Sequence, residues 1–367
     1  MILYGYEQQT ANGLDEMKSY FRPAIDAIAG YTPGEQPKIS NLIKLNTNEN
    51  PYPPSPAVAE ALRRFDTERL RRYPDPTADA LRDAVAERWG VKRENVICGN
   101  GSDDLLTMVF RAFTSPELPV AVLDPSYSLY PVLAAMQEAP VIRIPLAAGG
   151  FELEADLVQA AKGANLAMLT RPNAPTGNSL DRATVERFCR DFDGVVVIDE
   201  AYADFAADDC MEFAAKFDNV LVMRTFSKSY SLAGVRLGYA VGAKELTDGL
   251  MKLKDSYNLD MLTQAVGLAA FNDRPTLAKH VAMIRATRAR LAGELEKLGF
   301  AVVPSQSNFL FVSPPDGDAA RIFSELRQAA VIVRYFPGET TGKYIRITIG
   351  TDEETDRLLE VLRRICR

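Results

Sequence analysis

The chain has 367 residues, with 42 Lys or Arg against 49 Asp or Glu and a formal net charge of -7. This length suggests two domains, because a typical domain holds about 100–200 residues. Hydrophobic residues make up 47% of the chain, and no stretch approaches the roughly 18 apolar residues of a membrane span, so we expect a soluble protein without a membrane partner. The acidic balance argues against a nucleic-acid partner, since phosphate backbones are bound by clustered Lys and Arg.

The chain has four cysteines and one histidine. Cys98, Cys189, Cys210 and Cys366 are too far apart for a CxxC pair, and disulfides are rare in reducing cytosol, so we expect structural thiols. The opening residues lack the features of a secretory signal, which favours a cytoplasmic location. His280 is expected to be exposed or to cap a helix. No metal site is predicted, and the chemistry must rely on Lys, Tyr, Asp and Arg.

Seven short apolar runs alternate with amphipathic segments between residues 94 and 242, a pattern typical of βαβ units around a mostly parallel sheet. The runs cover residues 96–98, 120–123, 141–144, 166–169, 195–198, 220–223 and 237–241. Polar loops follow five of them, at 99–103, 124–127, 171–173, 199–202 and 224–228. Because ligands of open α/β sheets bind outside the carboxyl ends of the strands, these loops predict one shared crevice.

The C-terminal part of the chain predicts a smaller α+β domain. Helices are expected at 275–298, at 319–330 and from 353 onward, and strands at 309–312, 331–333 and 344–349. Residues before 45 are rich in Pro, Gly and polar side chains, which indicates an arm rather than a domain. We therefore predict an arm at 1–45 that contributes to the small domain, a large domain at 46–272 and a small domain at 273–367.

The segment Gly99-x-Gly101-x-x-Asp104 follows the first strand and imitates a dinucleotide-binding fingerprint. Asp104 replaces the third glycine, and a nicotinamide site would not explain the lysine loop described below, so a Rossmann dehydrogenase is disfavoured. The glycines allow a tight turn that places the amides of Ser102 and Asp103 at the start of a helix expected at 104–113, where free N–H groups favour a phosphate. A simple N-capped helix is the alternative.

Two further motifs bring acid–base groups to the crevice. Asp199-x-x-Tyr202 places a carboxylate at the end of a buried strand. A carboxylate there is costly unless a cation pairs with it, and the protonated ring nitrogen of a pyridine cofactor is one such partner. A structural salt bridge or a capping role is an equally good alternative. Ser227-Lys228 follows the next strand, with Arg236 eight residues later. A lysine can form a Schiff base with an aldehyde cofactor while hydroxyls and an arginine hold its phosphate, whereas a surface lysine is the alternative.

The segment Ser227-Lys228…Arg236-x-Gly238, together with Asp199-x-x-Tyr202 and Pro175-Thr176-Gly177, resembles the site of fold-type I aminotransferases, which use pyridoxal phosphate. The resemblance covers roughly residues 31–350 and implies an α/β fold with a mostly parallel seven-stranded sheet in the large domain plus a smaller α+β domain. It is closest to histidinol-phosphate aminotransferases, through Gly30-Tyr31-x-Pro33-Gly34-Glu35, Leu45-Asn46-x-Asn48-Glu49-Asn50-Pro51, Arg72-Tyr73-Pro74-Asp75 and Tyr344-Ile345-Arg346-Ile347-Thr348.

The resemblance implies a role for each cofactor-binding residue. Lys228 binds the cofactor covalently and then moves the proton between the substrate carbon and the cofactor carbon. Asp199 pairs with the pyridine nitrogen, Tyr202 hydrogen-bonds the ring oxygen and Tyr127 stacks on the ring. The phosphate is held by the amides of Ser102 and Asp103, by Thr225, Ser227 and Arg236, and by Tyr73 from the second subunit of a homodimer.

The substrate-binding residues are likewise implied by the resemblance. Arg346 matches the arginine that binds the carboxylate of the amino-acid partner, where a planar bidentate fork suits the geometry. Arg334 and Tyr31 match groups that receive the phosphate of histidinol phosphate, and Asn48 lies in a further substrate-binding motif.

The chain departs from the family pattern at one position. The family usually carries Asn directly before Pro-Thr-Gly, where it hydrogen-bonds the ring oxygen of the cofactor. This chain has Ala174 there, with Asn173 one residue earlier. Either Asn173 turns inward to bind the cofactor or Tyr202 acts alone.

The resemblance implies a transaminase that exchanges the amino group of L-histidinol phosphate with 2-oxoglutarate, in histidine biosynthesis. An aromatic amino-acid aminotransferase and a threonine-phosphate decarboxylase would share the same lysine loop and are the alternatives. A regulatory module with an aminotransferase-like domain is disfavoured, because the chain has neither the room nor the charge for a basic helix-turn-helix domain.

Overall fold

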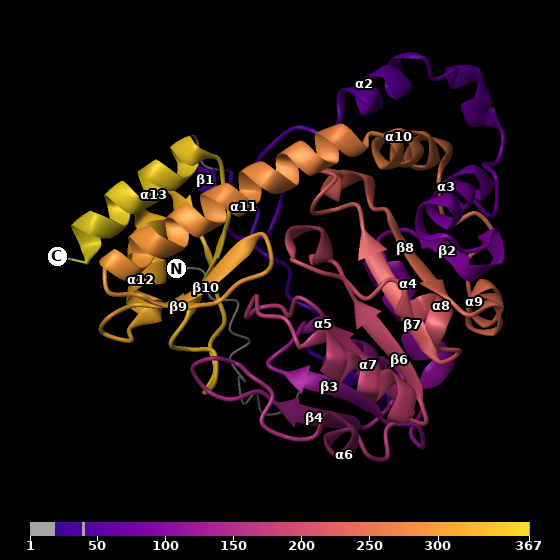
Figure 1. The fold of residues 1–367 in the computed structure, drawn as a ribbon, viewed down its shortest axis with the longest axis horizontal. Coiled ribbons are helices and arrows are strands. Elements are labelled where there is room, and N and C mark those ends of the chain that lie inside the picture. Colours follow the sequence, from indigo (N-terminus) through magenta and orange to yellow (C-terminus); the bar gives the residue numbers. More distant parts are fainter. Residues whose placement is uncertain (1–18, 39–40, 367) are drawn as a thin grey trace.

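The computed structural model describes residues 19–38 and 41–366 (Figure 1). The strands of its largest sheet are β2 (Val96–Gly99), β3 (Val120–Asp124), β4 (Val141–Pro145), β5 (Leu166–Thr170), β6 (Val195–Asp199), β7 (Val220–Thr225) and β8 (Gly238–Gly242). They lie in the order β2-β8-β7-β6-β5-β3-β4. Strand β8 is antiparallel to both of its neighbours, and the other neighbouring pairs are parallel. The predicted mostly parallel seven-stranded sheet is therefore confirmed.

Helices cover both faces of this sheet, which is why its strands are almost wholly apolar. One face carries α4 (Ser102–Phe113), α5 (Leu129–Met136) and α9 (Lys244–Met251). The other carries α3 (Asp79–Trp89), α7 (Arg182–Asp191), α8 (Phe213–Lys216) and α10 (Met261–Asn272). Successive strand side chains alternate between the faces, so Val197 of β6 packs toward α5 while Val196 and Ile198 pack on the opposite side. The same alternation directs Asp199, at the end of β6, toward the α5 side.

The C-terminal part has its own sheet and core. Its elements are α11 (Arg274–Lys297), β9 (Ala301–Val303), β10 (Phe309–Ser313), α12 (Ala319–Gln328), β11 (Val331–Ile332), β12 (Arg334–Tyr335), β13 (Ile345–Thr348) and α13 (Asp352–Ile365). Four of the strands form an antiparallel sheet in the order β12-β13-β10-β9. The prediction missed β9 and β12, because two or three residues are too few to establish a period, and the strand expected at 331–333 corresponds to β11. In Figure 1, α11 reaches from this part to α10.

The N-terminal segment joins the C-terminal part. Its elements are α1 (Pro23–Asp26), β1 (Ile43–Lys44), α2 (Pro56–Arg63) and the 3-10 helix η1 (Thr67–Arg71); the remaining short elements of the chain are η2 (Arg93–Asn95), α6 (Leu157–Ala160), η3 (Ala203–Phe205) and η4 (Ala233–Val235). Strand β1 pairs in parallel with β11, and Leu45 packs in the same core as β10 and β13. Residues 46–50 therefore pass between the two sheets. Residues 1–18 and 39–40 of the expected arm lie outside the described residues.

Three expectations from the composition of the chain can be compared with the structure. No helix within residues 19–38 and 41–366 is long and apolar enough to cross a membrane. The four cysteines are free thiols, and three of them are buried, as expected. His280 lies in α11 and is half-buried against Tyr52, with ring centroids 5.3 Å apart. The expectation that His280 is exposed or caps a helix is therefore wrong, because α11 packs on the segment that contains Tyr52.

Candidate active site

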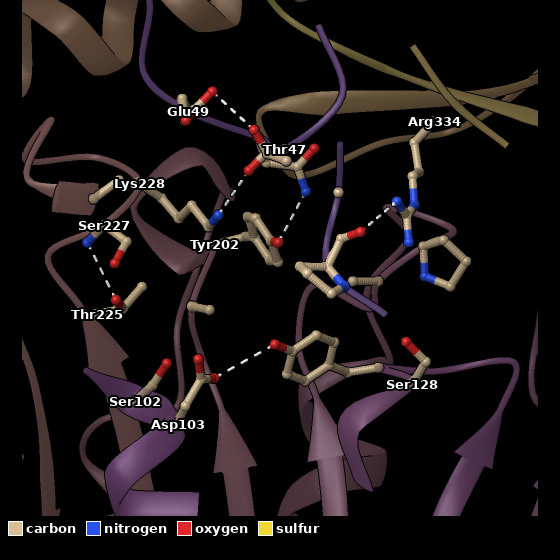
Figure 2. Close-up of a pocket in the computed structure, with 18 of the residues that line it drawn as sticks. Thr47, Glu49, Ser102, Asp103, Ser128, Tyr202, Thr225, Ser227, Lys228 and Arg334 are labelled. Atoms are coloured by element: carbon tan, nitrogen blue, oxygen red, sulfur yellow. Dashed lines mark hydrogen bonds between the residues drawn. The ribbon is translucent and has the colours of Figure 1, made fainter. Parts of the chain in front are cut away.

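A pocket of about 500 Å³ lies where the carboxyl ends of the large sheet face the C-terminal sheet. All five polar loops or the residues next to them contribute to it, so the expected crevice exists. Figure 2 shows Lys228 pointing across this pocket, above Ser102 and Asp103 at the start of α4 and opposite Arg334. The predicted site residues that line the pocket are Tyr31, Asn48, Ser102, Asp103, Tyr127, Asp199, Tyr202, Thr225, Ser227, Lys228, Arg236, Arg334 and Arg346.

The amine of Lys228 is held inside the pocket and is easily deprotonated. Its Nζ donates a hydrogen bond to the carbonyl oxygen of Thr47 at 3.0 Å. Burial lowers the pKa of Lys228 from 10.5 to about 8, and the nearby Arg346 guanidinium acts in the same direction. A large part of the amine is therefore neutral near pH 8, the form required of a nucleophile or a base.

Asp199 is a buried carboxylate that lacks a cationic partner in the part of the chain that the structure describes. Its Oδ2 atom lies 2.7 Å from the Tyr130 hydroxyl oxygen, and its Oδ1 atom accepts a hydrogen bond from the Ala201 amide at 3.1 Å. Burial raises the pKa of Asp199 above its usual value. The structural salt bridge considered for Asp199 is thus not formed, and the carboxylate remains available to a cationic ligand in the pocket.

Tyr202 and Asn48 form one unit at the wall of the pocket. The Asn48 amide donates to the Tyr202 hydroxyl at 2.9 Å, and the Tyr202 ring packs edge-on against Phe309 at 5.1 Å. The Lys228 Nζ lies 5.9 Å from the centre of the Tyr202 ring. Asn48 and Phe309 therefore fix the Tyr202 ring beside the lysine.

The start of α4 forms an anion site. The helix begins at Ser102, two residues earlier than predicted, because Gly101 adopts a φ of 83°. A Cβ atom on Gly101 would lie 2.6 Å from Nη2 of Arg236, so only glycine allows the arginine this close to the helix start. The Arg236 guanidinium donates to Ser227 Oγ and to the Asp103 carboxylate, both at 3.2 Å. Free helical amides beside a guanidinium are a suitable phosphate site.

Two further arginines lie on the opposite wall, both from the C-terminal sheet. Arg346 is sandwiched between the rings of Phe309 and Phe336, each 5.2 Å from its guanidinium carbon, and donates to the carbonyl oxygen of Asn46 at 3.0 Å. Its Nε is buried without a hydrogen-bond partner among the described residues. Arg334 donates to the carbonyl oxygens of residues 32 and 33 at 3.1 and 3.2 Å. This wall can bind an anionic group from the substrate side.

Two predicted site residues are not brought into the pocket. The Asn173 amide is buried and donates to the carbonyl oxygen of Pro125 at 2.9 Å and to Thr176 Oγ1 at 2.8 Å, while Ala174 lines the pocket instead. Asn173 therefore does not turn toward the pocket in this structure. Tyr73 is 76% exposed and stacks on Tyr257, with ring centroids 4.4 Å apart.

The structure adds a buried ion cluster that the sequence analysis missed. Arg224, near the end of β7, pairs with Glu200 at 2.8 Å, Asp204 at 2.7 Å and Asp209 at 3.0 Å. Glu200 follows Asp199 directly, so strand alternation sends it to the opposite side of the sheet. Burial raises the pKa of Glu200 to about 7. One guanidinium thus ties the loop after β6 to the strand that precedes Lys228.

The pocket also contains uncharged groups that the sequence analysis missed. Thr47 accepts from Lys228, Thr170 lies opposite Asp199 on the neighbouring strand, and Ser126 contacts Thr170. Gln36 and Ser128 also line the pocket. Tyr130, a buried residue that contacts Asp199, was missed as well, although it is three residues after Tyr127 and therefore one helical turn away. That spacing was the one available signal for it.

A lysine with a lowered pKa, a buried carboxylate without a cation and an anion site at a helix start define an enzyme site that binds a phosphorylated ring. The model of the family described as "Aminotransferase class I and II" matches residues 40–362, and the chain belongs to this family. The chain is 43% identical over 348 residues to histidinol-phosphate aminotransferase 1 of Nostoc sp., covering 95% of this chain and 98% of that protein. It is 44% identical over 352 residues to histidinol-phosphate aminotransferase 2 of Thiobacillus denitrificans, covering 95% and 98%.

Among solved structures, the chain is similar to histidinol-phosphate aminotransferase from Sinorhizobium meliloti in complex with pyridoxal-5'-phosphate, with a TM-score of 0.86 and 27% sequence identity. The match covers 95% of this chain and 99% of that one. The pocket residues of the present chain fit such a cofactor. Asp199 offers a buried negative charge to a protonated ring nitrogen, and the α4 start with Arg236 offers donors to a phosphate.

Proposed function

We propose that this protein is a pyridoxal-phosphate-dependent transaminase that exchanges the amino group of L-histidinol phosphate with 2-oxoglutarate, giving imidazole-acetol phosphate and L-glutamate in histidine biosynthesis. The observation that carries the proposal is one pocket that contains Lys228, Asp199 and two separate anion-binding walls. Arg236 stands at the first wall, and Arg334 with Arg346 at the second. The similarity to proteins named histidinol-phosphate aminotransferase at 43 and 44% identity over nearly the whole chain supports the same substrate.

The chain's own residues divide the chemistry among them. When bound, pyridoxal phosphate supplies an aldehyde for the amino group and an electron-accepting ring. Lys228 provides a neutral amine that accepts a proton from the substrate carbon and delivers it to the cofactor carbon. Asp199 keeps the ring nitrogen protonated, because a charged pair is favoured over an isolated buried carboxylate. Tyr202 donates its hydroxyl hydrogen to the ring oxygen, while Asn48 holds the hydroxyl in place.

The second wall can bind the anionic group of each substrate, first the phosphate of the amino donor and then the carboxylate of the acceptor. We propose that Arg334 and Tyr31 bind the phosphate of histidinol phosphate and that Arg346 binds the carboxylate of glutamate or 2-oxoglutarate. The unpartnered Nε of Arg346 supports this role, because a buried donor without an acceptor is satisfied when a carboxylate binds. The two flanking phenyl rings hold the guanidinium in one plane, which suits bidentate binding.

Removal of the Arg334 guanidinium tests the phosphate assignment. Arg334→Gln is expected to reduce kcat/KM for histidinol phosphate by about 10–100-fold, the value of a charged hydrogen bond, and to change kcat/KM for phenylalanine by less than about threefold. Steady-state assays with both amino donors measure this difference. Arg285→Gln, which removes an exposed arginine of α11, is the matched control and should leave both values unchanged. An equal loss for both donors would contradict phosphate recognition by Arg334.

The lowered pKa of Lys228 gives a pH prediction for cofactor uptake. Only the neutral amine attacks an aldehyde, and burial moves the pKa of Lys228 down to about 8. The rate at which cofactor-free protein takes up pyridoxal phosphate should therefore rise about tenfold per pH unit below pH 8 and level off above it. Stopped-flow absorbance measures this rate. A rate that continues to rise to pH 10, as for an ordinary lysine, would contradict the assignment.

The proposal includes a homodimer located in the cytoplasm. Three large apolar or aromatic side chains are exposed in the segment from α2 to just after η1. They are Leu62 in α2 (49% exposed), Leu70 in η1 (53%) and Tyr73 just after η1 (76%). Exposed aromatic and aliphatic side chains of this kind are typical of a subunit interface, and they support a role for Tyr73 in the partner's site. The unpaired thiols support a reducing compartment.

A further inference from the structure

A chain of hydrogen bonds runs from Asp199 to Asn173 along the wall of the pocket. Tyr130 Oη lies 2.7 Å from Asp199 Oδ2 and 2.9 Å from Thr170 Oγ1. Ser126 Oγ lies 3.1 Å from Thr170 Oγ1 and 3.0 Å from Asn173 Oδ1. Tyr130, Thr170, Asp199 and Asn173 are all at most 5% exposed. These four contacts connect the carboxylate of the site to Asn173, the residue before Ala174.

The orientation of Asn173 is set by its other contacts. Its Nδ2 atom lies 2.9 Å from the carbonyl oxygen of Pro125, which can only accept a hydrogen bond. The amide therefore cannot be turned around, and Oδ1 must face Ser126. Because Oδ1 is also only an acceptor, the hydroxyl hydrogen of Ser126 is committed to Asn173.

A count of the hydroxyl hydrogens shows that this hydrogen-bond chain has two states, one with a neutral and one with an ionised Asp199. With Ser126 donating to Asn173, Thr170 can donate to Ser126 and Tyr130 to Thr170. The fourth contact, between Tyr130 and Asp199, is then filled only if Asp199 itself carries a proton. If Asp199 is ionised, three hydroxyl hydrogens serve four contacts, so Tyr130 turns to the carboxylate and one contact between hydroxyls loses its hydrogen.

We propose that Asn173 acts on the reaction through this chain, holding Asp199 as the neutral acid in the ligand-free protein until a cationic ring binds, Asp199 releases its proton to the solvent and the Tyr130 hydroxyl turns to donate to the carboxylate. Tyr130 is thus a positioning residue for Asp199. The other groups that act on Asp199 are the Ala201 amide, which favours the carboxylate, and Asp103 at the start of α4, whose negative charge favours the acid. Burial acts in the same direction as Asp103 and raises the pKa of Asp199.

The hydrogen-bond chain predicts how each variant shifts the titration of Asp199. Ser126→Ala leaves two hydroxyl hydrogens for two contacts with an ionised Asp199, so the carboxylate form no longer loses a contact and the titration midpoint of Asp199 should fall by about one pH unit. Asn173→Ala frees the Ser126 hydrogen and should act in the same direction. Tyr130→Phe removes the partner of Asp199 in both protonation states and disconnects it from the chain, so in this background Ser126→Ala should no longer shift the midpoint. Loosening of the structure would shift the midpoint whether or not the Tyr130 hydroxyl is present.

Infrared spectroscopy of the cofactor-free, full-length protein measures this midpoint. The carboxylic-acid C=O band of Asp199 is identified by its absence from the Asp199→Asn variant and is followed as the pH is raised. Tyr239→Phe is the matched control, because Tyr239 is equally buried and accepts from Trp89 at 3.1 Å, outside the chain. The control should leave the midpoint unchanged. No fall of the midpoint in Ser126→Ala, or an equal fall when Ser126→Ala is added to Tyr130→Phe, would overturn the proposal.

The cationic ring in this proposal rests on the proposed function, and a second measurement separates the two. Pyridoxamine 5'-phosphate is titrated into the cofactor-free proteins at a pH between the midpoints of the normal protein and the Ser126→Ala variant. Its dissociation constant should fall by up to about tenfold in Ser126→Ala, and this effect should vanish in the Tyr130→Phe background, because ionisation of Asp199 is part of binding. A Tyr130-dependent infrared shift without any binding of this probe would support the hydrogen-bond chain and contradict the cofactor assignment.

Discussion

Replacement of Lys228 by alanine is expected to abolish transamination, with kcat falling by at least about 10⁴-fold. The variant loses both the nucleophilic amine and the base that moves the proton. The amine is the one lysine nitrogen that lines the described pocket, and Thr47 holds it there at 3.0 Å. Steady-state assays with histidinol phosphate and 2-oxoglutarate measure the loss.

Lys228→Arg sharpens this test, since it retains the positive charge but not an amine that is neutral near pH 8. It should be as inactive as the alanine variant. Lys252→Ala, which removes an exposed lysine just after α9, is the control and should keep normal turnover. Turnover within tenfold of normal in either Lys228 variant would show that another group performs the proton transfer.

Asp199→Asn should produce the second-largest loss of activity. The side chain keeps its shape but not its charge, so the buried ion pair with the ring nitrogen is broken at a cost of about 3–5 kcal/mol, equivalent to about 10²–10³-fold or more in kcat/KM. Cofactor affinity should fall as well. Comparison of kcat/KM and cofactor dissociation for the variant and the normal protein measures both effects.

Glu200→Gln is the matched control for Asp199→Asn. Glu200 is the neighbouring residue and equally buried, but it faces Arg224 on the other side of the sheet. Its replacement should lower the thermal stability and change kcat/KM by no more than a few fold, since a broken buried pair acts on folding rather than on the reacting atoms. If the two variants lose activity equally, the charge of Asp199 has no special role.

The large sheet was predictable because its strands carry strong local signals. Runs such as 195–198 are β-branched and uninterrupted, and a polar loop follows each of the five strands that end at the pocket. The start of α4 was predicted two residues late, because the positive φ of Gly101 lets the helix begin at Ser102. In the C-terminal part, β9, β11 and β12 have two or three residues each, and only their pairing partners define them.

The pocket was predictable in its charged residues but not in its hydrogen bonds. Lys228, Asp199 and Arg236 follow from strand ends and motif spacing, whereas Arg334 and Arg346 follow only from the resemblance to the family. The sequence left two possibilities for Asn173, and the contact with Pro125 decides between them, because it holds the amide away from the pocket. Tyr130 reaches Asp199 only through the packing of α5 on the sheet. The proposed contribution of Tyr73 depends on a second subunit, so a single chain does not test it.

The most direct test of the proposed function is the reaction of the purified enzyme with one substrate at a time. Histidinol phosphate alone should change the absorbance of the bound cofactor completely, with one imidazole-acetol phosphate formed per site, and 2-oxoglutarate should then restore the spectrum with one glutamate formed. The second-order rate constant for histidinol phosphate should exceed that for phenylalanine by at least about tenfold. No spectral change with histidinol phosphate, together with a complete change with phenylalanine or carbon dioxide release from threonine phosphate, would contradict the proposal.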